Sequence, residues 1–525
     1  MKLVLKKLSL IVSVATLATL AMTGTAYAAA KVMNPGEATG QLVYLSADDV
    51  LKESPKYKSL NPLSIPVFGE MPLDMSVVAG AITLKQQNLL SHVQLKSRAR
   101  HTPNLDISGL EGGIENAMFK NFPDGSWIRM VLGADGSIKI EASNEAAATA
   151  AYNKKKTAKV NLEADVQTST IFRTEELGSP DFVRVGSKAA NYAELAKVLN
   201  TASRTVVRPG FGIPFYYYEE FVNANPKIKA AIEALLRDPL MKRVAKVEYR
   251  EAKLKAIRDM MTATDAVMNE KLVDELISRF EQVRSNNQPR KMKLRSSTNS
   301  EDLPNFNGAG LYTSESYKPV NKEGKEKKDA KKRESLKEAL QVVWASVWNL
   351  RAYDEREFFS IPHAQVRMGM QVNPSFANEG ADGVVVTKNM AADPRYPGYG
   401  VYIEAQRGDD HSVANPEPGV KPMRVLVLVD QNDKLNVAKY DVKVLQTSNI
   451  GDDNKTILPN DNPIPVMTTE ELKDLVYQSL KAEAHFGPTL DPQNKNFSLD
   501  LEFKVDAEDT GKRQVYLKQA RPYID

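Results

Sequence analysis

The chain of 525 residues contains no cysteine. It therefore has no disulfide bond, no thiolate nucleophile and no metal site with cysteine ligands. A strong excess of charge of one sign is also missing. Without the three lysines of the first 28 residues, 67 basic side chains face 66 acidic ones. Because such a chain lacks the positive field that holds a nucleic-acid backbone, we expect no nucleic-acid partner.

Long apolar runs are missing too, except near the start of the chain. Three lysines precede an apolar run over 8–22, and a cleavage site of small residues ends at Ala28. This order predicts a secretory signal peptide over 1–28, with cleavage near Ala28. A retained membrane anchor is the alternative, but the run is shorter than the ~20 residues that a bilayer requires. We expect an exported protein, periplasmic or secreted, without stable membrane insertion.

The length of the chain predicts two or three domains, because one hydrophobic core rarely serves so many residues. Short strand-like runs separated by turns, among them 77–82 and 127–132, fill the region 36–150. A linker follows over 151–179. In the region 180–525, the sequence predicts a set of helices from Lys227 to about Val283, followed by alternating strands and helices. This order predicts a multidomain protein of mixed α/β and α+β class.

A polar segment in the middle of the chain has the composition of a phosphate-binding loop. Between Leu294 and Gly310 it combines Arg295, several hydroxyl side chains, an acidic pair and two glycines. Arginine supplies a permanent charge with forked donors, and glycine lets backbone N–H groups approach phosphate oxygens closely. The same composition also suits an ordinary polar loop, so distant segments must decide between the two interpretations.

The end of the chain predicts a β-hairpin. Residues 499–505 alternate strictly between apolar and polar side chains, and a second strand-like run covers 515–521. Thr510-Gly511 suits the turn, because glycine accepts a positive φ.

This turn sets Glu502 opposite Gln519 and Asp500 opposite Arg521. A carboxylate and an amide oxygen side by side suit Mg²⁺, and the arginine suits a phosphate. A solvated hairpin face is the alternative interpretation.

Lys188 follows Gly186-Ser187 at the start of a helical pattern, where the helix N-terminus favours anions. The segment lacks the glycine spacing of a Walker A loop, and an exposed lysine is the alternative. A second helical stripe runs from Leu336 to Leu350, and we expect Arg351 at the end of that helix.

His92 occupies the first turn of another predicted helix, which Ser91 and Gln94 would begin as a capping box. A histidine in this position could carry a phosphoryl group covalently and so split one transfer into two. The alternative is a polar histidine near a helix cap.

The region 180–525 resembles the ATP-binding domain shared by phosphoenolpyruvate synthase, pyruvate phosphate dikinase and the plant glucan water dikinases. The resemblance implies an ATP-grasp-like nucleotide-binding domain that uses ATP and Mg²⁺. Six segments carry it in the same order: 185–188, 294–314, 344–352, 383–387, 500–503 and 519–522.

The segment around His92 is similar to the phosphohistidine segment of glucan water dikinase, which also precedes the ATP-binding domain. This similarity implies a small swivelling phosphohistidine-like β/α domain over 36–150. The resemblance assigns roles residue by residue. Phosphate contacts fall to Lys188, Arg295, Arg351 and Arg521, the metal to Glu502 and Gln519, a further nucleotide contact to Gln371, and phosphorylation to His92.

The resemblance therefore implies an exported, dikinase-like phosphotransferase that passes a phosphoryl group from ATP through His92 to a small molecule or a glycan. We expect pyruvate not to be the acceptor, because the family's pyruvate-binding barrel does not follow. Residues 406–410 also depart from the family's Gly-Leu-Gly-Glu turn, and extracytoplasmic compartments hold little ATP. An exported ATP-binding protein without turnover, or an interaction protein with a vestigial pocket, remains the alternative. The sequence does not fix the oligomeric state.

Overall fold

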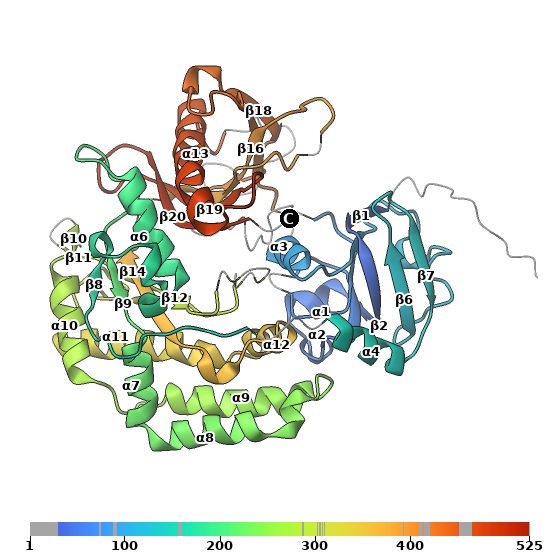
Figure 1. Cartoon of the computed structure of the whole chain (residues 1–525), viewed down its shortest axis with the longest axis horizontal. Coiled ribbons are helices and arrows are strands. Elements are labelled where there is room, and N and C mark those ends of the chain that lie inside the picture. Colours follow the sequence, from blue (N-terminus) through green and yellow to red (C-terminus); the bar gives the residue numbers. More distant parts are fainter. Residues whose placement is uncertain are drawn as a thin grey trace, which may run out of the picture.

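The computed structural model forms sheets of seven, five and six strands and a short two-stranded ribbon, with helices packed against them (Figure 1). The chain is therefore a multidomain protein of mixed α and β structure, as predicted. The predicted signal peptide over 1–28 lies outside the described residues. The structure describes residues 30–523 except 73–74, 88–91, 156–159, 286–287, 302, 304–305, 307, 309, 378, 392, 409–412, 414–419 and 451–464.

The seven-stranded sheet contains the first part of the chain and has the order β1-β5-β4-β3-β2-β6-β7. Strands β2 to β5 pair in parallel, whereas the outer pairs are antiparallel. The predicted strand over 127–132 is confirmed as β6. The strand predicted over 77–82 is displaced, because Val77 and Val78 are buried before the ladder begins at Ala81. The elements are β1 (Lys31–Asn34), β2 (Gly36–Leu45), α1 (Ala47–Leu51), α2 (Pro55–Lys58), β3 (Ser64–Phe68), β4 (Ala81–Thr83), α3 (His92–Ala99), β5 (Asn104–Asp106), β6 (Trp127–Leu132), β7 (Ile138–Ala142) and α4 (Glu145–Lys155).

The five-stranded sheet has the order β13-β12-β14-β9-β8 and shares an apolar core with the helices around it. The predicted helical set after residue 227 is confirmed as α8 to α10. The elements are β8 (Phe172–Arg173), α5 (Phe182–Val185), α6 (Ser187–Leu199), β9 (Phe211–Ile213), α7 (Tyr216–Ala224), α8 (Pro226–Arg237), α9 (Val247–Met261), α10 (Glu270–Glu281), β10 (Arg284–Ser285), β11 (Gln288–Pro289), β12 (Met292–Thr298), β13 (Glu315–Tyr317), α11 (Asp329–Ala345), α12 (Leu350–Phe358) and β14 (Met368–Pro374).

The prediction that Arg351 ends the helix starting near Leu336 is wrong. The helix α11 stops at Ala345, and the hydroxyl of Ser346 donates to the backbone oxygen of Val343 at 2.6 Å. Asn349 then adopts an extended conformation with ψ of 138°, and α12 begins one residue later. Because the backbone changes direction there, Arg351 lies in the first turn of a separate helix.

The six-stranded sheet has the order β18-β17-β16-β15-β19-β20, and its two faces differ in chemistry. One face is apolar and packs against α13 and α6, because alternate residues of the strands are Val, Leu, Ile and Phe. The other face carries charged and amide side chains beside a small apolar cluster around Val384 and Val386, and part of it contacts Arg295 of the five-stranded sheet. The elements are β15 (Glu379–Val386), β16 (Gly400–Gln406), β17 (Met423–Leu428), β18 (Asp441–Gln446), α13 (Thr469–Leu490), β19 (Leu499–Asp506) and β20 (Gln514–Pro522).

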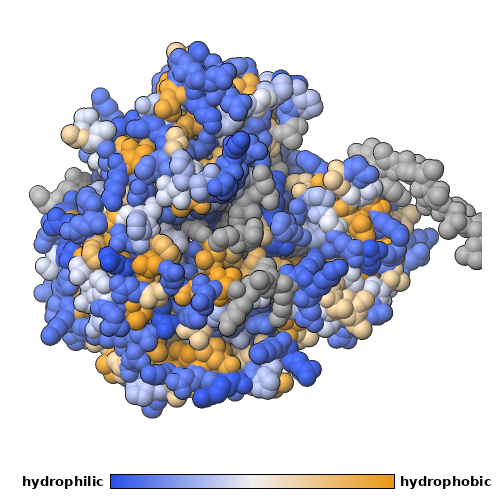
Figure 2. Space-filling model, in the orientation of Figure 1, coloured by the Kyte–Doolittle hydropathy of each residue, from blue (hydrophilic) through white to orange (hydrophobic). Residues whose placement is uncertain are grey.

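The surface is mostly hydrophilic, and the hydrophobic residues visible on the face in Figure 2 form separate groups. The large hydrophobic side chains that are exposed, such as Leu51, Phe182 and Val444, come from different parts of the chain. None of the helices in the described part of the chain is both long enough and apolar enough to cross a membrane.

Candidate nucleotide site

Three of the predicted site residues meet where β12 faces the hairpin of β19 and β20. Nη2 of Arg295 donates hydrogen bonds to Oε2 of Glu502 at 3.0 Å and to Oε1 of Gln519 at 2.9 Å. Its Nη1 donates to the backbone oxygen of Lys518 at 2.8 Å. The guanidinium of Arg295, which belongs to the five-stranded sheet, therefore contacts both side chains that the sequence predicted as metal ligands.

The hairpin has the predicted register, with Glu502 opposite Gln519 and Asp500 opposite Arg521. A β-bulge follows Glu502, so that Lys518 becomes an extra residue on β20. Nζ of Lys518 lies 3.2 Å from Oε2 of Glu502. Sequence reasoning missed this lysine, because the strand pattern gives no signal of the bulge.

The two carboxylates of β19 differ in their electrostatic environment. Burial opposes the ionisation of Glu502, but Lys518, Arg295 and Arg521 outweigh it and hold the pKa of Glu502 well below its ordinary value. Burial raises the pKa of Asp500, and Arg521 opposes this shift only in part. Glu502 is thus an anion at neutral pH, while a charge on Asp500 is costly in the free protein.

Arg521 and Asp500 form a buried ion pair beside this cluster. Nε of Arg521 donates to Oδ2 of Asp500 at 2.8 Å, and the two side chains are 6% and 2% exposed. The other oxygen of Asp500, Oδ1, is buried and has no hydrogen-bond partner in the part of the chain that is described. An unpaired buried acceptor at this point is suited to a ligand. The alternation along β19 already set Asp500 and Glu502 on one face, but sequence reasoning did not count Asp500 among the site residues.

Lys188 lies in the first turn of α6, near the helix N-terminus as predicted, and its side chain reaches β12. Its Nζ donates to the backbone oxygen of Ser296 at 2.8 Å and lies 3.2 Å from Oε1 of Glu301. Gly186, which precedes the helix, has φ of +84°, and a Cβ there would lie 2.5 Å from the backbone of Ser297. Glycine therefore permits the close approach of the helix to the strand.

Gln371 lies directly opposite Arg295 in the five-stranded sheet. Its side chain is buried, and its Nε2 donates to Oδ1 of Asn373 at 2.7 Å. Its Oε1 has no hydrogen-bond partner among the described residues. Gln371 therefore offers a buried acceptor next to the central arginine.

The other two predicted residues lie on neighbouring elements. Arg351 is partly buried in the first turn of α12. His92 is the first residue of α3, so its predicted place in the first turn of a helix is confirmed. Its side chain and Ser91, and with them the predicted capping box, lie outside what the structure describes.

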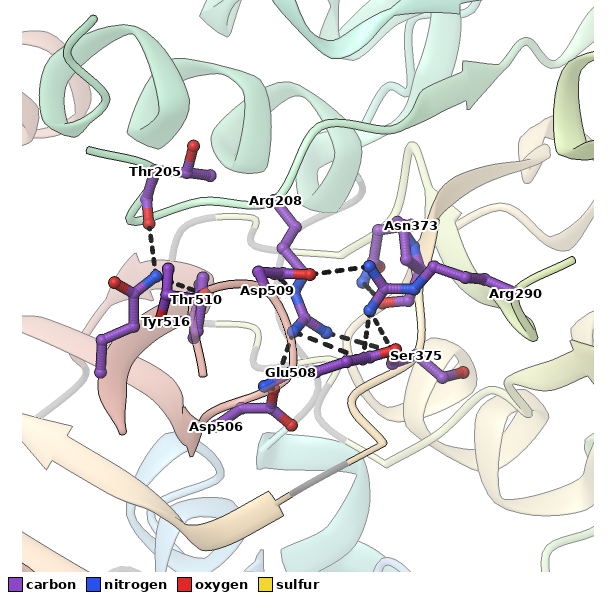
Figure 3. A network of polar contacts seen from close by, with 12 residues as sticks. Thr205, Arg208, Arg290, Asn373, Ser375, Asp506, Glu508, Asp509, Thr510 and Tyr516 are labelled. Atoms are coloured by element: carbon purple, nitrogen blue, oxygen red, sulfur yellow. Dashed lines mark hydrogen bonds and ion pairs between the residues drawn. The ribbon is translucent and has the colours of Figure 1, made fainter. Parts of the chain in front are cut away.

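A second polar cluster, which we call the hairpin clamp, fixes the turn end of β19 and β20 to the five-stranded sheet (Figure 3). Arg208, of which 2% is exposed, lies 2.9 Å from Asp506 and 2.7 Å from Asp509. Arg290 lies 2.8 Å from Asp509 and donates to Glu508. Both arginines also donate to the backbone oxygen of residue 375. The clamp therefore holds the two sheets together beyond the Arg295 cluster.

The pair of Glu502 and Gln519 fits a magnesium ion that also binds a triphosphate. Mg²⁺ usually takes one or two carboxylates together with substrate phosphates and water. Within the described ranges, no three carboxylate or histidine side chains gather closely enough to hold a metal alone. The two oxygens beside Arg295 and Lys518 therefore suit a metal that arrives with its own anionic ligands.

Residues 183–524 match the sequence pattern of the family described as "Pyruvate phosphate dikinase, AMP/ATP-binding domain". The chain therefore belongs to this family. A phosphoenolpyruvate synthase from Aeropyrum pernix is 23% identical over 362 residues, which make up 64% of this chain and 40% of that protein. The chain thus spans less than half the length of this relative.

Proposed function

We propose that this protein is an exported, ATP-dependent phosphotransferase of the dikinase type, in which His92 carries the phosphoryl group. The observation that carries the proposal is the contact of Arg295 with both Glu502 and Gln519. This contact gathers a forked cation, an anionic oxygen and an amide oxygen from two sheets. Phosphoryl transfer depends mainly on positioning and charge neutralisation, which these side chains provide.

In the proposed site, an ATP-grasp-like domain holds ATP between the two sheets. Arg295, Lys188, Arg351 and Arg521 bind phosphate oxygens, and Gln371 accepts a hydrogen bond from the nucleotide. Glu502 and Gln519 would hold Mg²⁺, which would neutralise phosphate charge when bound. Arg295 contacts the oxygens of both Glu502 and Gln519, so its guanidinium lies next to the position proposed for the metal and its phosphate ligands.

The transfer proceeds in three steps. An imidazole nitrogen of His92 forms a bond to the β-phosphorus of ATP, and the bond from that phosphorus to the α–β bridging oxygen breaks, so that AMP leaves with the electron pair. Water then attacks the γ-phosphorus, the β–γ bridging P–O bond breaks, and inorganic phosphate leaves, so that one phosphoryl group stays on His92. An acceptor hydroxyl then attacks the phosphorus bound to His92, the P–N bond breaks, and the hydroxyl releases its proton. The swivelling of the seven-stranded-sheet domain would bring His92 from ATP to the acceptor, a small molecule or a carbohydrate.

Incubation of the purified chain with ATP labelled in its β and γ phosphates tests this proposal. We expect label on the wild-type protein, none on His92→Ala, and wild-type label on His101→Asn. His101 is a matched control, because it is an exposed histidine in the same domain, and asparagine tolerates its φ of +50°. An unlabelled wild type, or equal label on His92→Ala, would refute the proposal.

A second candidate is an exported ATP-binding protein without turnover. It is favoured by Arg407, which is buried and donates to the backbone oxygens of Ile450 and Pro465 at 3.3 and 3.0 Å. The turn that replaces the family's Gly-Leu-Gly-Glu motif is thus used to hold neighbouring loops. Calorimetric titration with ATP and Mg²⁺, followed by a measurement of AMP, separates the candidates. Tight binding without AMP formation supports this second function.

A further inference from the structure

A buried ion pair joins the end of α3 to α12. Arg100 directly follows α3, and Glu355 lies in the middle of α12, 255 positions further along the chain. Nε of Arg100 donates to Oε2 of Glu355 at 3.0 Å, and Nη2 donates to the other oxygen. Each side chain is only 2% exposed. The contact is therefore bidentate and shielded from water.

The remaining contacts of Arg100 lie within its own domain. Its Nη1 donates to the backbone oxygen of Ser76 at 2.9 Å, and its Nη2 donates to that of Met75 at 3.1 Å. These two carbonyl groups fix the orientation of the guanidinium, so that its Nε and Nη2 point toward Glu355. The seven-stranded-sheet domain therefore presents a preorganised cation to α12.

A second polar contact joins α3 to the chain directly after β20, next to the candidate nucleotide site. Nη1 of Arg98 donates to the hydroxyl of Tyr523, two residues beyond Arg521 at the end of β20. Figure 1 shows α3 between the seven-stranded sheet and these elements. The C-terminal end of α3 and the residue after it thus contact both the helix that carries Arg351 and the residue that directly follows β20, the strand that carries Arg521.

An apolar contact supports the ion pair at the same interface. The ring of Tyr152 in α4 lies 6.1 Å from that of Phe358, which is one turn after Glu355 in α12. An apolar contact gives attraction without direction, whereas a bidentate ion pair requires one relative orientation. Both charges also regain water when the interface opens, so a buried ion pair adds little net stability, while its two hydrogen bonds restrict the orientation of the partners. This combination suits an interface that opens and closes in one defined pose.

We propose that Arg100 and Glu355 are positioning residues whose ion pair is a latch. The latch holds the seven-stranded-sheet domain in the pose in which α3 faces the nucleotide site. Its effect on phosphoryl transfer rests on the proposed function. Its effect on the pose of the domain does not.

The absence of cysteine allows a direct test of the pose in the full chain, because two introduced cysteines can be spin-labelled without other reactive thiols. Ala134, in the turn between β6 and β7, and Lys253, in α9, are exposed and lie on opposite sides of the interface. Pulsed electron paramagnetic resonance then gives the distance distribution between them. We expect one main peak for the wild type and a second, displaced peak for Arg100→Gln and Glu355→Gln.

Arg129→Gln is the matched control, because Arg129 binds Glu37 through Nε at 2.7 Å and Nη2 at 2.6 Å within the seven-stranded sheet itself. This variant should keep the wild-type distances. The double variant Arg100→Gln/Glu355→Gln leaves no unpaired buried charge, so it should fold and still show the displaced peak. Wild-type distances in Arg100→Gln and in the double variant would overturn the latch.

The effect of the ion pair on phosphoryl transfer can be measured separately from its effect on the pose of the domain. We expect Arg100→Gln to lower the rate of label transfer from ATP by about tenfold or more, since a small misplacement of a reacting group is enough for such a loss. The calorimetric Kd for ATP should stay at the wild-type value, because Arg100 does not touch the nucleotide site. A parallel loss of ATP affinity would assign Arg100 a merely structural role and overturn the inference. A displaced peak in a protein whose wild type takes no label would leave the latch standing and refute the proposed function.

Discussion

Replacement of Glu502 by glutamine tests the chemistry of the candidate site most directly. The side chain contacts Arg295 at 3.0 Å and Lys518 at 3.2 Å, and it is 20% exposed. A charge-assisted hydrogen bond stabilises a protein by roughly 1 kcal/mol more than a neutral one. Glutamine keeps the shape and one acceptor oxygen but removes the charge. With two contacts and partial screening by water, we expect a loss of roughly 1–2 kcal/mol in the free energy of unfolding.

Unlike the small loss of stability, the effect of Glu502→Gln on ATP binding should depend on whether Mg²⁺ is present. Glutamine is a poor magnesium ligand compared with a carboxylate, so the affinity for ATP in the presence of Mg²⁺ should fall by about tenfold or more, or at least ~1.4 kcal/mol. Without Mg²⁺, the affinity for ATP should stay equal or increase, because Arg295 and Lys518 no longer share their charge with an anion. Calorimetric titrations with and without Mg²⁺ measure both values.

The control for this experiment is Asp474→Asn. Asp474 binds Arg204 through a hydrogen bond of 2.9 Å in a part of the six-stranded-sheet region that lies outside the candidate site. This variant should lose comparable stability and keep the wild-type response to Mg²⁺. An equal loss of affinity for ATP with and without Mg²⁺ in Glu502→Gln would show that Glu502 does not hold the metal. A loss of stability far above the value given for the variant would assign it a structural role.

Three further predictions concern buried charges. Because burial raises the pKa of Asp500, the folded chain binds more protons than the unfolded chain as the pH falls from 7 toward 4, so this carboxyl should contribute increasing stability over that range. The Tm of the wild type relative to that of Asp500→Asn should therefore rise as the pH falls, and the variant should bind Mg²⁺–ATP more weakly. A difference in Tm that does not change with pH would contradict this reasoning. Burial lowers the pKa of His363 from 6.5 to about 4, so the unfolded chain binds more protons between these values. The free energy of unfolding in urea should fall by roughly 3 kcal/mol as the pH decreases through this window, and an unchanged pH dependence in His363→Gln would refute the cause. Arg208→Gln removes a cation that lies 2.9 Å from the fully buried Asp506 and should reduce the free energy of unfolding by about 3–5 kcal/mol in the same assay; a loss below about 1 kcal/mol would contradict the role of the clamp.

The hairpin could be predicted from the sequence because its signals are local. Strict alternation over 499–505 separates two faces, and a glycine marks the turn, where Gly511 has φ of +70°. Side chains opposite each other follow from these two facts. The bulge after Glu502 could not be predicted, because it depends on how the hairpin meets the five-stranded sheet. As a result, sequence reasoning placed Gln519 correctly and missed Lys518.

Local sequence patterns could not predict which polar side chains are buried or which distant residues they contact. The stripe from Leu336 correctly predicted a buried helical face, but not the break at Asn349 that places Arg351 in a new helix. The buried Arg100 and Glu355 look like ordinary surface residues in the sequence. Their pairing depends on the packing of two domains, and no spacing rule links positions 255 residues apart.

The contacts of the β19–β20 hairpin explain how a site built from two sheets can keep one geometry. Arg295 binds the hairpin near its open end, and the clamp of Arg208 and Arg290 binds its turn. Two attachments along one rigid hairpin fix both its distance from β12 and its angle to it, whereas one attachment would leave a pivot. The oxygens of Glu502 and Gln519, which we propose to hold the metal, therefore stay within reach of Arg295, even though each comes from a different strand. The side chains in the clamp would thus support the proposed site although they do not contact the Arg295 cluster.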